Sequence, residues 1–344
     1  MSSFYRAVNW NRQKFIYDSV LAVLVMSYLG IFMGITLTRD PNATIETAFI
    51  RALGSGALGL LTITLMLGPL ARLTPRVLPI LYNRRHLGVT VCLLGLGHAT
   101  AALIQFHTLG DVNPFVSVLT GAADVRKISA FPFEWLGLLA LGILTLMAAT
   151  SHDYWLATLS APVWKGLHML VYVAFGLLVA HVTFGNLQAT TNPVPVILLG
   201  GQATLVFGLQ CWAGWRERAG DQDAVVAGTD GWVDVCGVTE IRESRARIAL
   251  VGGERIAVFR YEGKVSCVSN VCQHQNGPLG EGKIVDGCIT CPWHGYQYLP
   301  DSGQSPPPFT EKIPTFNVRV QGGRVLVHST PNSPGTRVDP AVIR

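Results

Sequence analysis

Charged side chains are scarce in this sequence of 344 residues. Asp, Glu, Lys and Arg make up 14% of it, against about 25% in a typical soluble protein, while hydrophobic residues make up 49%. Residues 166–215 contain no Asp, Glu, Lys or Arg. A stretch of that length without charge cannot be a solvated loop, so the composition excludes a wholly soluble protein and indicates one that lies in a membrane.

Other signatures are missing as well. The seven cysteines are an odd number and lack the spacing of an extracellular disulfide framework. The sequence contains no glycine-rich nucleotide fingerprint and no hydrolase nucleophile motif, so it offers no catalytic site of those kinds. The formal net charge of +5 needs no nucleic-acid partner, because the positive residues lie largely at the ends of apolar segments.

Six apolar segments are long enough to cross a membrane. At 1.5 Å per residue, about 17 to 23 residues of helix span the roughly 30 Å of hydrocarbon. The first segment is too long for a signal peptide and has no small-residue cleavage site, so we expect an uncleaved helix there. The sequence thus predicts a membrane α-helical bundle with six transmembrane helices, at residues 16–37, 48–70, 87–106, 133–149, 163–184 and 194–212.

Lys and Arg are distributed unevenly over the connections between these segments. With the N-terminus inside, the outer side holds only Arg39, Arg51, Arg126 and Lys127. The inner side then holds Arg6, Arg12, Lys14, Arg72, Arg76, Arg84, Arg85, Lys165, Arg216 and Arg218. Positive residues favour the cytoplasmic side, so we predict a multi-pass protein of a bacterial-type inner (plasma) membrane with both termini in the cytoplasm.

The sequence changes character after residue 215. A polar linker at 216–230 precedes short segments with the alternation and β-branched content of strands. The predicted strands are Trp232–Val235, Arg247–Leu250, Arg255–Tyr261, Val265–Ser269, Lys283–Ile289, Phe316–Val320 and Arg324–Val327. We therefore predict a helical membrane domain at 1–215, a small all-β domain at 231–328 and a flexible tail at 329–344.

Two short motifs in the β-domain combine cysteine with histidine. Cys272 and His274 are followed, after sixteen intervening residues, by Cys291 and His294. A [2Fe–2S] cluster with thiolates on one iron and imidazoles on the other needs one Cys and one His from each of two loops. The ligand types alone would also allow a structural Cys2His2 zinc site, but the paired spacing beside Pro-Leu-Gly and Cys-Pro-Trp-His-Gly favours the cluster.

On these motifs, residues 231–327 resemble the Rieske ferredoxin family, which implies a [2Fe–2S] cluster. High-potential members carry an extra Cys in each loop and a Ser after the second His, whereas this chain has Gly277, Trp293 and Tyr296 there. Hydrogen bonds to the cluster's sulfurs raise its reduction potential, and Tyr298 is the donor that remains. The resemblance thus implies a low-potential cluster, closer to those that serve ring-hydroxylating oxygenases.

Three histidines fall inside the predicted spans: His98 in the third, and His168 and His181 in the fifth. Ionisable side chains in a membrane span are functional candidates, and a bis-histidine haem b needs imidazoles from two neighbouring helices. The step from His168 to His181 covers about 20 Å of ideal helix, enough for two membrane depths, but also turns by about 140°. A hydrogen bond between helices is the alternative role for each histidine.

The first 215 residues resemble the ferric reductase-like transmembrane family, and more closely its short haem-binding branch, the membrane subunit of the bacterial methionine sulfoxide reductase system. The resemblance is carried by Arg84-Arg85-His86-Leu87-Gly88, by Thr150-Ser151 and by the stretch from Trp164 to Tyr172. It implies that His98, His168 and His181 are haem b ligands.

Three histidines are enough for one bis-histidine haem, and a second haem needs a fourth ligand. His86, His107 and His152 lie near the predicted membrane boundaries and are candidates for it; interfacial solvation is the alternative role of each. The glycines at positions 54, 56 and 59 are expected to permit close contacts between helices.

Together these parts predict an oxidoreductase, or an electron-transfer subunit of one, that relays single electrons between the cluster and haem b. Electrons could enter from a flavin reductase or ferredoxin and leave to quinone, a metal ion or a periplasmic acceptor, or flow in reverse to a cytoplasmic oxygenase. The low potential expected of the cluster favours the first direction. Two alternatives stay open: a membrane-anchored Rieske ferredoxin without haem, and a redox sensor. Membrane lipid and a redox protein are the expected partners.

Overall fold

The computed structural model describes residues 12–343 except for 75–76, 78–79, 81–82, 109, 121–130, 152–154, 156–158, 160, 186, 189–190, 223–229, 275–276, 293–294 and 308. The chain divides into two compact units. Among the described residues one, the helical unit, comprises 12–70 and 83–211; the other comprises residues from 71–82 and 212–343 and contains the β-domain.

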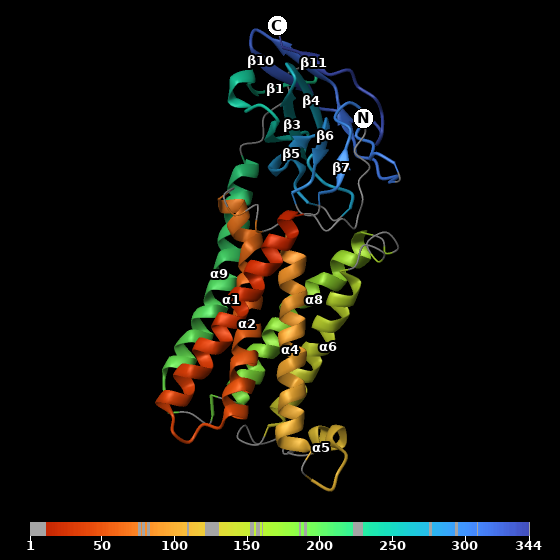
Figure 1. Ribbon diagram of the computed structural model, residues 1–344. Coiled ribbons are helices and arrows are strands. Elements are labelled where there is room, and N and C mark those ends of the chain that lie inside the picture. Colours follow the sequence, from red (N-terminus) through yellow and green to blue (C-terminus); the bar gives the residue numbers. More distant parts are fainter. Residues whose placement is uncertain are drawn as a thin grey trace. The chain divides into compact units, whose positions relative to one another are not determined.

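Long apolar helices dominate the helical unit (Figure 1). The helices are α1 (Arg12–Arg39), α2 (Ile45–Leu73), α4 (Arg84–His107), α5 (Pro114–Thr120), α6 (Phe133–Thr150), α8 (Ala161–Phe184) and α9 (Val194–Gln222). Six of them, all but the short α5, are long and apolar enough to cross a membrane, which confirms the predicted spans. α9 continues through the start of the segment predicted as a linker, and its last residue is Gln222.

The α2 helix lies at the centre of the bundle. Its residues Leu58, Leu61 and Leu65 share one apolar cluster with buried side chains of α4, α6, α8 and α9, while Leu53 belongs to a second cluster with α1 and α4. The outward faces are also apolar, as at Val23 of α1, a residue that is 64% exposed. Since lipid tails are as apolar as these side chains, the outward faces suit a hydrocarbon surrounding.

Several polar groups inside the bundle have hydrogen-bond partners. The hydroxyls of Thr62 and Thr64 in α2 donate to carbonyls one turn earlier, at 2.8 and 2.7 Å. The amide of Gln210 in α9 donates to the Tyr172 hydroxyl of α8 at 2.6 Å. Such bonds remove the cost of an unpaired polar group in an apolar surrounding and also hold helices together.

The β-domain consists of short antiparallel strands. They are β1 (Trp232–Gly237), β2 (Arg245–Val251), β3 (Glu254–Tyr261), β4 (Lys264–Ser269), β5 (Lys283–Val285), β6 (Cys288–Thr290), β7 (Gln297–Tyr298), β8 (Thr315–Phe316), β9 (Val318–Gln321), β10 (Arg324–His328) and β11 (Ala341–Val342). Three sheets have the orders β1-β10-β9, β11-β4-β3-β2 and β5-β6-β7, and β8 pairs with β4. The last sheet and the end of β4 position the cysteine and histidine motifs.

Two predicted strands are each split into two. Residues 283–289 form β5 and β6 because Asp286 and Gly287 turn the chain with φ values of 50° and 76°. Residues 316–320 divide at Asn317 into the end of β8 and the start of β9, which pair with different partners. Short turns inside an apolar run leave the alternation almost unchanged, so the pattern alone merges the strands.

The tail is not loose, and that prediction was wrong. Ala341 of β11 pairs with Val265 of β4, and the Val338 N–H donates to the Asp301 carbonyl at 2.7 Å. The Asn332 N–H similarly donates to the carbonyl of Thr315 at 2.9 Å. Pro, Ser and Gly suggested disorder by composition, but here they form an irregular segment whose backbone groups bind those of the domain.

Candidate redox sites

The first cysteine and histidine motif lies on a loop that leaves β4. An isolated bridge between Val271 and Pro278 closes this loop, and the Cys272 N–H donates to the Gly277 carbonyl at 2.9 Å. Asn270, which is 3% exposed, accepts the Gly280 N–H on its side-chain oxygen at 2.7 Å. These bonds fix both ends of the loop, so the positions of Cys272 and of the residues after it are set by local backbone contacts.

The second motif lies on the turn between β6 and β7. Thr290 pairs with Gln297 across the hairpin, and the Cys291 N–H donates to the Tyr296 carbonyl at 2.8 Å. Gly295 closes the turn by donating to the Cys291 carbonyl at 3.0 Å, with a φ of 71° that glycine adopts without strain. His294 and Trp293 lie outside the described residues.

The two cysteines meet in one buried cluster. Cys272 and Cys291 are each 1% exposed and pack in the same apolar cluster as Tyr296 and Tyr298. The Tyr298 hydroxyl accepts the Gln273 N–H at 3.0 Å and lies 3.5 Å from Cys272 Sγ. Since that hydroxyl already accepts a bond, its own proton can point to the sulfur, which places Tyr298 where a sulfur donor is expected.

Burial, and after it the neighbouring Cys272 thiol, raises the pKa of Tyr298. The phenol is therefore neutral at physiological pH and keeps its proton for donation. Burial and the hydrogen bond to Glu311 also raise the pKa of Tyr296. Both tyrosines are thus neutral donors.

His274 lies against an aromatic ring. Its imidazole stacks on Tyr296 with ring centroids 4.8 Å apart and an interplanar angle of 9°. The Tyr296 hydroxyl donates to the Glu311 carboxylate, and its ring also packs 4.8 Å from Phe309. Tyr296 stands where high-potential Rieske proteins carry a serine, so the chain uses that position to hold the imidazole rather than to donate to sulfur.

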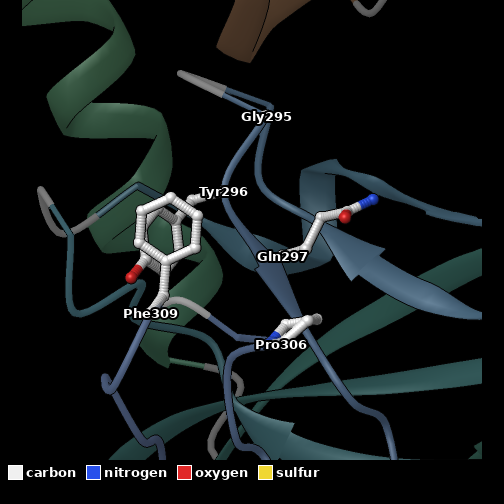
Figure 2. A pocket seen from close by; sticks show the side chains of 5 residues that line it. All are labelled: Gly295, Tyr296, Gln297, Pro306 and Phe309. Atoms are coloured by element: carbon white, nitrogen blue, oxygen red, sulfur yellow. The ribbon is translucent and has the colours of Figure 1, made fainter. Parts of the chain in front are cut away.

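The Tyr296 ring also lines a small pocket. Figure 2 shows Tyr296 and Phe309 side by side, with Gly295, Gln297 and Pro306 completing the lining. The lining is mostly apolar and has no acid, base or nucleophile. The pocket offers packing contacts beside the second loop and no catalytic group.

The donor set of this site fits a dinuclear cluster. A [2Fe–2S] cluster of this kind takes thiolates on one iron and imidazoles on the other. Two buried thiols, an imidazole and a sulfur-directed phenol are the groups that a Rieske cluster uses.

In the helical unit, two of the three membrane histidines face each other. The ring centroids of His98 on α4 and His181 on α8 are 6.3 Å apart, with an interplanar angle of 87°. Two metal–imidazole bonds of about 2 Å, plus roughly 1 Å from nitrogen to ring centre on each side, give about 6 Å. The pair therefore has the spacing of two imidazoles on one metal.

Both rings are held through the same nitrogen. His98 Nδ1 bonds to the Ile50 carbonyl at 2.9 Å, and His181 Nδ1 bonds to the Phe133 carbonyl at 2.8 Å. A carbonyl only accepts, so Nδ1 carries the proton in each ring and Nε2 keeps its lone pair. Neutral imidazole with a free Nε2 is the form that binds haem iron.

His168 has different surroundings. Its ring stacks on Trp164 with centroids 3.5 Å apart, its Nδ1 bonds to the Trp164 carbonyl at 3.1 Å, and its Nε2 lies 3.4 Å from the Ser151 hydroxyl. Both ring nitrogens thus have partners within the protein. The resemblance implied a haem ligand at His168, and the contacts equally suit a hydrogen-bonded imidazole.

The candidates for a fourth ligand are also held by polar neighbours. His86 Nδ1 lies 2.7 Å from an Asp18 carboxylate oxygen, and His107 Nδ1 lies 2.9 Å from the Ser117 hydroxyl. His152 lies outside the described residues. The contact with Asp18 was not predicted, since nothing in the sequence indicated that the start of α1 meets the start of α4.

Comparison with known proteins separates the chain into two families. Residues 231–317 match the family model of the Rieske [2Fe-2S] domain, and residues 53–179 match that of the ferric reductase like transmembrane component. The chain is a fusion of these two families. It is therefore a membrane electron-transfer protein, and its Rieske domain supports a [2Fe–2S] cluster.

The Rieske part is similar to ferredoxin components of oxygenase systems and to a desaturase. Over 101 residues the chain is 31% identical to the ferredoxin component of the alkene monooxygenase system of Xanthobacter autotrophicus, which covers 29% of this chain and 83% of that protein. It is 34% identical over 103 residues to cholesterol 7-desaturase nvd 1 of Ciona intestinalis, which covers 29% of this chain and 22% of that protein. A solved complex of oxygenase and ferredoxin in carbazole 1,9a-dioxygenase matches with a TM-score of 0.28 and 27% identity, over 30% of this chain and 96% of that chain.

Proposed function

We propose that this fusion relays single electrons between a Rieske cluster and a haem b in the membrane. Cys272, His274, Cys291 and His294 would hold the cluster, and His98 with His181 would hold the haem. A haem supplies one-electron redox chemistry between two helices, and a [2Fe–2S] cluster also transfers one electron at a time. Because both cofactors would carry one electron at a time in the same chain, the simplest function that uses both is the transfer of electrons between them.

The observation that carries this proposal is the pairing of His98 with His181. The two ring centroids are 6.3 Å apart, the spacing of a bis-histidine metal site, and each ring bonds a backbone carbonyl through Nδ1, which leaves Nε2 for a metal. A helical domain that served only as an anchor would have no use for such a pair. The ferric reductase-like match, which includes His98 and ends two residues before His181, supports haem as the ligand.

The partner of the cluster is proposed to be another redox protein. The relatives that the chain covers most fully are ferredoxin components of oxygenase systems. A reductase or ferredoxin would reduce the cluster, and haem would pass electrons to quinone, a metal ion or a periplasmic acceptor. We place both termini in the cytoplasm of a bacterial-type cell, because Lys and Arg gather on that side of the six spans.

The haem to cluster ratio tests the relay. The detergent-solubilised full chain is expressed with adequate haem supply, and haem b is measured by pyridine haemochrome on the same sample as iron and labile sulfide. We expect one or two haems for each cluster. Clusters without haem would refute the relay and leave the anchored ferredoxin or the sensor.

A further inference from the structure

Each of the two paired histidines rests on a glycine of a neighbouring helix. A Cβ atom added to Gly54 of α2 would lie 2.9 Å from His98 Nδ1, and one added to Gly137 of α6 would lie 2.9 Å from His181 Nδ1. Protein interiors tolerate no such approach without a shift of one partner. Each histidine ring therefore occupies the space that a side chain in place of the glycine would need.

The hydrogen bonds of the two rings repeat the same arrangement. The carbonyl that binds His98 belongs to Ile50, four residues before Gly54, and the carbonyl that binds His181 belongs to Phe133, four residues before Gly137. Residues i and i+4 lie one above the other on a helix. We call each carbonyl together with its glycine a notch: Ile50 and Gly54 form one, and Phe133 and Gly137 form the other. In each notch the histidine ring contacts the backbone of the neighbouring helix at both residues.

We propose that Gly54 and Gly137 are positioning residues of the haem site. Each glycine lets an imidazole lie against a helix, where the carbonyl fixes the tautomer and orientation of the ring and leaves Nε2 to the metal. This inference rests on the proposed function, since it takes His98 and His181 to be the ligands. The two notches lie on different helices, α2 and α6, so they form two independent parts of one site.

Alanine at either position would displace the ring or break its bond to the carbonyl. Loss of a group that orients a metal ligand typically weakens metal binding about 10- to 100-fold. The bond also makes the imidazole a stronger electron donor, which favours ferric haem. Any haem that remains in these variants should therefore have a higher reduction potential than that of the unaltered chain.

The same helices offer matched controls. Gly59 of α2 and Gly142 of α6 have nothing within 4 Å of an added Cβ. Alanine forms helices better than glycine does, so Gly59→Ala and Gly142→Ala should leave the bundle intact. The four variants are compared as full-length protein in detergent, by haem per cluster, by the electron paramagnetic resonance spectrum of low-spin haem and by haem reduction potential.

We expect Gly54→Ala and Gly137→Ala each to weaken haem binding about 10- to 100-fold and so lower haem per cluster, or to shift the spectrum and raise the potential of the remaining haem. The cluster content should stay unchanged, and both control variants should match the unaltered chain. Unaltered haem content, spectrum and potential in Gly54→Ala and Gly137→Ala would overturn the inference, as would equal losses in the controls. Clusters without haem in the unaltered chain would instead refute the proposed function.

If Gly54→Ala accumulates poorly, the cause is tested by also removing the His98 ring with which the added Cβ atom would clash. The double variant Gly54→Ala, His98→Ala should then accumulate as well as His98→Ala alone, because the clash no longer exists. Failure of the double variant to recover would show that Gly54 serves the fold in another way and would overturn the inference. Gly137→Ala with His181→Ala gives the same test for the second notch.

Discussion

The two redox sites of this chain are assembled over very different distances in the sequence. The loops of Cys272 and Cys291 are each closed by backbone bonds to residues five positions ahead, Gly277 and Tyr296. His98 and His181 come from different helices, and each is held by a carbonyl 48 residues away in the sequence. The cluster site is thus largely a local construction, whereas the histidine pair depends on the packing of four helices.

This difference has a physical consequence. A site closed by short loops loses little chain entropy when it forms, because loop closure costs less for near residues. The histidine pair forms only when α2, α4, α6 and α8 are packed, so its geometry depends on how these four helices pack together. We therefore expect changes at one site to leave the other intact.

The largest effect is expected from the cysteines. Cys291→Ser removes a buried thiolate ligand, so the [2Fe–2S] cluster should be lost completely while haem is retained. Visible absorbance, electron paramagnetic resonance and labile sulfide measure the cluster. Cys288→Ser is the matched control, since Cys288 lies three residues earlier on β6 and is only half-buried. A cluster that survives Cys291→Ser, or that disappears with Cys288→Ser, would contradict the assignment.

The histidines of the bundle come next. His181→Ala should abolish binding of the haem at the His98 pair, because one axial ligand is lost, and should leave the cluster spectrum unchanged. His168→Ala should leave that haem bound, since the ring of His168 is held by Trp164 and Ser151 instead. Haem counts separate the cases: a fall from two haems to one in His168→Ala would show that His168 holds a second. The loss of all haem in His168→Ala would contradict the pairing of His98 with His181.

The sequence predicted the local parts of this molecule better than the distant ones. The six spans and the two cysteine loops follow from apolar runs and from residue types at short spacing, which act within one element. Gly54 was expected to bring helices together, but the structure sets it against His98, a contact that depends on the packing of α2 on α4. The bond between Asp18 and His86, and the pairing of the tail with β4, likewise required tertiary contacts that no periodicity reveals.

A smaller effect is expected from the tyrosine beside the cluster. Tyr298→Phe removes the hydroxyl 3.5 Å from Cys272 Sγ, and loss of a bond of about 1 kcal/mol should lower the one-electron potential of the cluster by on the order of 40 mV. Protein-film voltammetry or a redox titration measures this, with cluster content unchanged. Tyr261→Phe controls for the loss of a buried phenol, because the Tyr261 hydroxyl bonds to Ser266 at 2.9 Å. Equal potentials in both variants would exclude Tyr298 as a sulfur donor.

The smallest effect is expected where α1 meets α4. Asp18→Asn weakens the contact between the Asp18 carboxylate and His86, which are 26% and 23% exposed and 2.7 Å apart. A charge-assisted bond in a partly exposed position contributes on the order of 1 kcal/mol, so the midpoint of thermal unfolding in detergent should fall by about 2 to 4 °C. Asp40→Asn is the control at the other end of α1, because Asp40 accepts the Asn42 N–H within a local turn. Few residues of α1 are buried against the bundle, so we expect α1 to pack less tightly while the histidine pair stays unchanged. Loss of haem in Asp18→Asn would contradict this and would make the contact part of the haem site.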